Sequence, residues 1–171
     1  GAIDDLDIRD DADELVGAEF AIDVTLHGVA GVEYTLDDAD IDGDLSGVWN
    51  ITGNVDDIDA DGGEVAGWTL NVSGDLDDLD LGRVTNATVT VGSEGDWRTI
   101  DDLEADHWLA GGLEAGAIDD FDIRDDADEL PGDEFAIDVT LHGVAGVDFT
   151  LDDADIDGDL SGVWNITGNV D

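Results

Sequence analysis

Apolar and polar residues alternate along many short segments of this chain. Residues 22–28, 68–74 and 87–92 read Ile-Asp-Val-Thr-Leu-His-Gly, Trp-Thr-Leu-Asn-Val-Ser-Gly and Ala-Thr-Val-Thr-Val-Gly. Such period-two alternation is typical of β-strands with one buried face, and Val, Ile, Thr and Trp favour strands. Each segment ends at glycine, which accommodates the positive φ of a sharp corner. The pattern therefore predicts an all-β protein.

A longer pattern recurs at intervals of about twenty residues. Residues 50–60 match residues 71–81, an offset of 21. The element Asp-Asp-apolar-acid-apolar, or a looser copy of it at Asp37, begins at Asp4, Asp37, Asp56, Asp77, Asp101 and Asp119. Repeats of this length are typical of stacked coils. We therefore expect a parallel β-solenoid, or β-helix, with coils of roughly 20 residues.

The alternation also divides inward from outward positions. The apolar residues expected to face the core are Ile51, Val55, Ile58, Leu70, Val72, Leu76, Leu79, Val89 and Val91. The aspartates between them are expected to point to solvent. Residues 9–20 and 124–135 do not fit the coil length, so we predict that each is a loop protruding from one coil.

A longer repeat has a period of 115 residues. Residues 1–56 recur as residues 116–171, with 51 of 56 positions identical. We expect residues 1–115 to form one full repeat unit and residues 116–171 the first half of the next, in one continuous solenoid. A string of β-sandwich domains is the alternative, because 115 residues suit one sandwich domain. The copy at an offset of 21 argues against it, since sandwich strands do not usually repeat one another.

Three segments carry a resemblance to a known class of proteins. Residues 44–55, 65–76 and 130–141 resemble coils and a loop-and-strand segment of large repetitive surface β-solenoid proteins of bacteria and archaea. This chain departs from their pattern by placing Asp where polar or basic residues often stand, which makes it a halophile-type acidic version. The resemblance implies a surface or matrix role and supplies no catalytic residues.

The charge of the chain changes this picture in one respect. There are 48 Asp and Glu residues and no Lys, so the formal net charge is -44. Self-repulsion of this size opposes compaction, but the screening length falls to about 3 Å at about 1 M salt. We therefore predict adaptation to molar salt. Nucleic acid is excluded as a partner, because the residues available to neutralise phosphate are Arg9, Arg83, Arg98 and Arg124.

Motifs for modification point to the outside of the cell. Asn50, Asn71, Asn86 and Asn165 each begin an Asn-X-Ser/Thr sequon, the acceptor for N-glycosylation on a secreted chain. No cysteine is present, so disulfides and thiolate metal sites are excluded. No run of 18 apolar residues occurs, which predicts that this segment does not span a membrane.

Two aspartate clusters are candidate calcium ligands. Asp40, Asp42 and Asp44 flank one flexible turn, and Asp59 and Asp61 flank another. Carboxylate oxygens are the ligands that Ca²⁺ prefers, but neither cluster has the distal Glu of an EF-hand loop. Loose screening of the acidic surface by cations is the alternative, and no other cofactor is expected.

No enzyme site is recognisable in the sequence. Carboxylates are too abundant to identify an acid and a base, and we interpret His107 as a surface histidine. Trp49 and Trp68 stand at corresponding places in successive coils, which predicts ring packing at a corner. An exposed aromatic stripe that binds carbohydrate is the alternative for the tryptophans.

These observations favour a structural role. We expect an extracellular or cell-surface filament, stalk or surface layer built from tandem repeats, whose partners are copies of itself. An adhesin or carbohydrate-binding surface module is the alternative function, with glycans as partners. A polysaccharide-degrading enzyme is the third class, and it requires turnover of acidic glycans.

Overall fold

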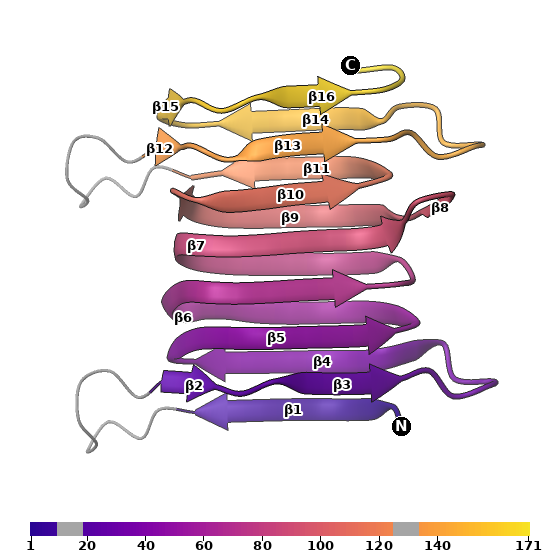
Figure 1. The fold of residues 1–171 in the computed structure, drawn as a ribbon, viewed down its shortest axis with the longest axis vertical. Helices are drawn as coiled ribbons and strands as arrows, with labels where there is room; N and C mark the ends of the chain where they lie inside the picture. The colour runs from indigo at the N-terminus through magenta and orange to yellow at the C-terminus, as the bar shows by residue number, and fades with distance from the viewer. Residues whose placement is uncertain (10–18, 125–133) are drawn as a thin grey trace.

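The computed structural model of the protein describes residues 1–9, 19–124 and 134–171, and these form β-strands without any helix (Figure 1). The strands lie in two rows that run in opposite directions and are stacked along the longest axis of the molecule (Figure 1). Pairing within each row is parallel, so the predictions of an all-β fold and of parallel strands are confirmed.

The first row contains β1 (Ile3–Arg9), β4 (Tyr34–Asp42), β9 (Thr99–Trp108), β11 (Ala117–Ile123) and β14 (Leu151–Ile156). The second row contains β2 (Glu19–Ala21), β3 (Val24–His27), β5 (Asp44–Thr52), β10 (Gly111–Ala115), β12 (Glu134–Phe135), β13 (Asp138–Leu141), β15 (Asp159–Leu160) and β16 (Trp164–Ile166). Two long strands, β6 (Asn54–Val72) and β7 (Leu76–Ser93), pass from the first row into the second. The short β8 (Asp96–Trp97) pairs antiparallel with the end of β7.

The register of these pairs follows the period of about twenty residues. In the first row Val55 pairs with Leu76, and Asp57 pairs with Asp78. In the second row Leu70 pairs with Val89. The two matching segments of the sequence therefore lie side by side. This parallel pairing differs from the antiparallel sheets that the β-sandwich alternative requires.

The core lies between the two rows. All of the residues expected to face inward are at most 2% exposed: Ile51, Val55, Ile58, Leu70, Val72, Leu76, Leu79, Val89 and Val91. Each such side chain contributes about 1.5–3 kcal/mol when removed from water. The inner faces of the two rows form one continuous apolar cluster, so the alternation in the sequence is sufficient to predict the core.

The buried tryptophans differ from the prediction in their register. Trp49 pairs with Leu70 and Trp68 pairs with Gly47, because the two tryptophans are 19 residues apart whereas the pairing offset at these positions is 21. The two tryptophans therefore do not occupy corresponding positions. Their rings still meet edge to face, with centroids 5.7 Å apart, and both are fully buried.

Glycine allows neighbouring strands to approach each other closely where the chain turns. Gly82 lies on the bend of β7, where an added Cβ would stand 2.6 Å from the carbonyl oxygen of Asp61 in β6. Gly111 begins β10 with a φ of 115°, a region that favours glycine. A side chain at Gly111 would overlap the backbone of Ala87. These contacts leave no room for a Cβ at either position.

The two copies of the long repeat make the same pairs. Ile3 pairs with Leu36, and their counterparts Ile118 and Leu151 also pair. The copies are joined because β9 pairs with β11 and β10 pairs with β13. Of the two predicted loops, residues 10–18 and 125–133 lie outside the described residues. The ends of those segments are strands rather than loop, since β2 and β12 begin there.

Candidate functional site

The outward side chains of the first row form stacked columns of carboxylates. We define the first carboxylate column as Asp5, Asp38, Asp57, Asp78, Asp102, Asp120 and Asp153. We define the second carboxylate column as Asp7, Asp40, Asp59, Asp80, Glu104, Asp122 and Asp155. Neighbouring strands are about 4.8 Å apart, so each carboxylate inside a column has another directly above and below it, and those at the ends have one neighbour. The columns arise because the Asp-Asp-apolar-acid element recurs in register.

This stacking changes the protonation of the carboxylates in the middle of the columns. Partial burial, and after it the charges of Asp78 and Asp38, raise the pKa of Asp57 to about 6. Burial likewise raises the pKa of Asp80 to about 6, with Glu104 the largest contributor among its charged neighbours. A raised pKa means that the folded state opposes the charged form. Repulsion between the charged carboxylates of the acidic face therefore destabilises the folded state at neutral pH.

One arginine partly offsets this repulsion. Arg124 follows β11 and forms ion pairs with Glu104 and with Asp122, the second at 3.1 Å. Its charge also lowers the pKa of Asp80 against the effects that raise it. Arg124 is about half exposed, so the bridge contributes at most about 1 kcal/mol. Most carboxylates in the two columns face other carboxylates instead.

A tyrosine hydroxyl contacts the acidic face near its first strands. Tyr34 donates a hydrogen bond of 2.7 Å to Asp77, and this bond raises the pKa of the Tyr34 hydroxyl. The pKa of the neighbouring Asp56 is raised by burial and then by the charge of Asp77. The second copy of the repeat has Phe149 in place of Tyr34. The hydrogen bond is therefore specific to the first copy.

The structure brings together some of the predicted calcium ligands. Asp59 and Asp61 lie near Asp80, and one oxygen from each of these three carboxylates lies within 4.8 Å of the others. Asp80 was not predicted, although the offset of 21 residues from Asp59 identifies it as the residue stacked on Asp59. In the described part of the chain, Asp40, Asp42 and Asp44 do not belong to such a group. Calcium binding itself stays a prediction.

The four sequon asparagines lie in or beside the second row. Asn50, Asn86 and Asn165 are exposed, whereas Asn71 is half-buried. Asn71 pairs with Asn50, and its side-chain nitrogen donates a hydrogen bond of 3.0 Å to the Asn50 side-chain oxygen. The side-chain nitrogen that would carry a glycan at Asn71 is therefore already hydrogen-bonded to Asn50. Exposure favours the other three asparagines as acceptors, and their glycosylation stays a prediction.

The interpretation of His107 as a surface residue was wrong, because His107 is only 2% exposed. It lies in β9, where Leu103 and Ala105 are also buried. The alternation of that strand places every second residue inward, and His107 occupies the next inward position. The same alternation that predicted the core elsewhere would have predicted this.

A hairpin that the sequence analysis missed projects from the end of β7. Trp97 of this hairpin stacks on His142 of the second copy, with ring centroids 3.9 Å apart and planes 3° apart. The His142 ring also hydrogen-bonds Glu114 over 2.9 Å. A pocket beside this contact is lined in part by Asp75, Arg98, Trp97 and Val144. The hairpin therefore links the first repeat unit to the second.

The destabilising effect of the repulsion between carboxylates is testable with one substitution. We expect Asp57→Asn to raise the free energy of unfolding by about 1 kcal/mol at pH 7 and low salt. The amide keeps the size of the side chain and removes a charge held between Asp38 and Asp78. Urea unfolding followed by circular dichroism measures the change. Asp5→Asn is the control, because Asp5 is exposed and lies at the end of the column; an equal gain from both variants would contradict the argument.

No protein-family model matches the chain, and neither the curated proteins nor the solved structures contain a match. Across residues 1–9, 19–124 and 134–171, the structure holds no helix of the length and hydrophobicity that a membrane crossing requires.

Proposed function

We propose that this chain is a β-solenoid whose tandem units form the shaft of an extracellular filament, stalk or surface layer. The observation that supports this best is the in-register parallel pairing of residues about twenty positions apart, as between Ile58 and Leu79. The pairing continues without a break from residues 1–115 into residues 116–171, where Leu103 pairs with Phe121. A stack of this kind lengthens by adding further units of the same sequence.

The proposed shaft derives its stability from contacts between neighbouring coils. In repeat proteins each unit contacts only its neighbours, so stability is approximately a sum of unit and interface terms. Here the interfaces consist of buried apolar side chains between the rows and of backbone hydrogen bonds along them. Self-association of further units is the partner interaction that this arrangement favours.

The acidic face supports a location in salty surroundings outside the cell. A net charge of -44 and the two carboxylate columns keep such a shaft hydrated where salt screens their repulsion. Exposed sequons at Asn50, Asn86 and Asn165 are placed where a secreted chain could carry glycans. Cations that associate loosely with the columns would further lower the repulsion.

The carbohydrate-binding alternative receives less support from the positions of the aromatic rings. Trp49, Trp68 and Trp108 are at most 1% exposed and pack within the core. These rings are therefore not available to stack on a sugar. Only a row of exposed rings would favour an adhesin over a plain shaft.

Small-angle X-ray scattering tests the proposed shaft. One further unit of 115 residues is inserted in phase, and both chains are measured in about 1 M sodium chloride, where screening is short-ranged. The five first-row strands of a unit predict a particle about 24 Å longer with an unchanged cross-section, because neighbouring strands are about 4.8 Å apart. A cross-section that grows with the added unit would reject the solenoid and the filament role with it.

A further inference from the structure

The same side chains are exposed in the first copy of the repeat and buried in the second. Ile22 is 49% exposed, whereas its counterpart Ile137 is 1% exposed. The following pairs show the same change from exposed or half-buried to buried: Ala2 and Ala117, Ile3 and Ile118, Phe20 and Phe135, Val24 and Val139. Identical or nearly identical sequences thus have an apolar edge in one place and an interface in the other.

Within the chain, β9, β10 and the β7–β8 hairpin cover this edge in the second copy. Ile118 pairs with Ile100, and Val139 pairs with Leu113. The backbone N–H of Gly116 donates to the Arg98 carbonyl over 2.7 Å. These contacts complete the interface that the Trp97–His142 stack begins. Residues 92–115 are therefore the segment that this edge fits.

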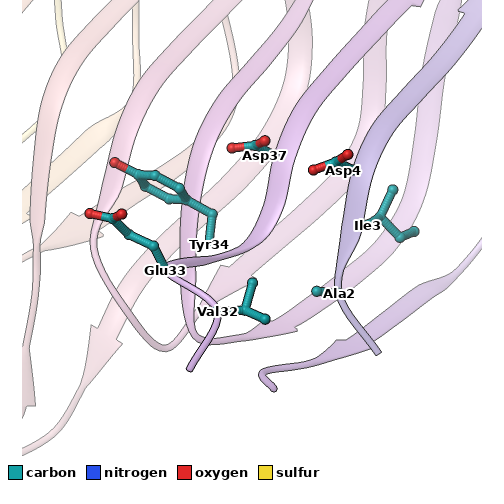
Figure 2. Close-up of a pocket in the computed structure, with 7 residues that line it drawn as sticks. All are labelled: Ala2, Ile3, Asp4, Val32, Glu33, Tyr34 and Asp37. Atoms are coloured by element: carbon teal, nitrogen blue, oxygen red, sulfur yellow. The ribbon is translucent and has the colours of Figure 1, made fainter. Parts of the chain in front are cut away.

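We propose that the edge formed by β1, β2, β3 and the turn after His27 binds residues 92–115 of another copy of the repeat unit. Among the described residues β1 pairs only with β4, and β3 pairs only with β5, so their outer sides carry no partner strand. Figure 2 shows a pocket at this edge, with Ile3, Val32 and Tyr34 around it. His27 is exposed there, in the position where His142 stacks on Trp97.

The opposite end of the stack requires a different partner. Leu160 is 54% exposed, but its counterpart Leu45 is fully buried. Leu45 pairs with Val65 of β6, so β6 is the strand that covers this end in the first copy. The end at β14 and β16 therefore fits residues 57–72 and does not fit the β1 edge of a second chain.

These two ends set a phase rule, which states at which point of the 115-residue unit a stack must stop in order to join another stack in native register. A stack that stops after β10 presents the partner that the β1 edge requires, whereas residues 1–171 alone present the equivalents of β4 and β5. Two copies of residues 1–171 alone are therefore not complementary end to end. A chain holding two whole units, with β1 at one end and the equivalent of β10 at the other, is complementary to itself. The inference deepens the proposed filament and rests on it, because the phase rule sets where units join.

The test extends the full chain at its C-terminus with a second copy of residues 57–115, which completes the second unit. In about 1 M sodium chloride, light scattering after size exclusion should show head-to-tail oligomers of the extended chain and monomers of the original chain. An extension by residues 57–91 lacks the hairpin, β9 and β10, so it should remain monomeric. In this matched pair only the phase of the end differs.

Two histidine variants of the extended chain test the contact itself. His27→Ala removes the exposed ring on which Trp97 of another copy would stack. It should weaken oligomer formation about tenfold, because the loss of one aromatic pair costs about 1.4 kcal/mol. His142→Ala removes the same residue at the internal junction, so it should lower the melting temperature and leave oligomer formation unchanged. Equal effects of the two variants on oligomer formation would overturn the assignment of His27.

The outcomes separate this inference from the proposed function. A monomeric extended chain with the scattering profile of a rod would overturn the phase rule and leave the solenoid standing. Equal association of the in-phase and out-of-phase extensions would also overturn it. A compact scattering profile for the original chain would reject the solenoid on its own, before any association is measured.

Discussion

The melting temperature of this chain at pH 7 should fall by about 15 °C when sodium chloride is lowered from about 1 M to about 0.01 M. The screening length rises over that range from about 3 Å to about 30 Å, while stacked carboxylates are about 4.8 Å apart. Each neighbouring pair then costs about 0.8 kcal/mol even in water. Summed over the two carboxylate columns, and with repulsion in the unfolded chain subtracted, the loss is about 5 kcal/mol.

Thermal unfolding followed by circular dichroism measures this dependence. Potassium chloride should act like sodium chloride, because screening depends on ionic strength rather than on the cation. Sucrose at the same osmolarity is the control for solvent exclusion, and it should give only a small part of the gain. A melting temperature that is independent of salt would show that the columns do not limit stability.

Acidification at low salt should stabilise this protein, whereas paired carboxylates usually make proteins acid-labile. The pKa of Asp57 and of Asp80 is about 6 in the folded state, against about 3.9 for an unfolded aspartate. Between these values the folded state binds more protons, so stability is lost as the pH rises from about 4 to about 6. With each group contributing about 1 kcal/mol after screening, the melting temperature should be about 5 °C higher at about pH 4 than at pH 7.

Further carboxylates act in the same direction, because the pKa of Asp61, Asp101, Asp102 and Glu104 is also raised, in each case by burial first. The measurement is thermal unfolding across this pH range in about 0.01 M salt and again in about 1 M salt. The gain on acidification should shrink in the high-salt series, since screening weakens the charge–charge part of the shift. A stability maximum at neutral pH in low salt would contradict the pKa values of Asp57 and Asp80.

The periodic part of the fold was predictable because one physical rule generates all of it. Alternation assigns each side chain to the core or to solvent, and an offset of 21 assigns Val55 to Leu76 and Ile58 to Leu79. These pairs depend only on local pattern and on repetition. The carboxylate columns follow from the same rule, and applying the offset to Asp59 would also have identified Asp80.

The departures from the pattern arise where the chain changes length between coils. The pairing offset between β5 and β6 changes from 20 at Leu45 to 21 at Gly47, and Trp49 therefore lies against Leu70. The β7–β8 hairpin adds residues at one corner, and the contact of Trp97 with His142 joins residues far apart in sequence. Alternation within a strand carries no information about how an added segment folds over the next coil. The contact between repeat units therefore required the structure.

The direction of the backbone hydrogen bonds has a mechanical consequence. The strands lie across the longest axis, so the bonds that join them run along it (Figure 1). In the proposed solenoid, a pull on the two ends of the stack would load these bonds one coil at a time rather than shear many of them at once. Each coil that detaches releases about twenty residues, or about 70 Å of extended chain. A filament of the proposed kind would therefore lengthen in small steps under sudden tension and refold when the tension ends.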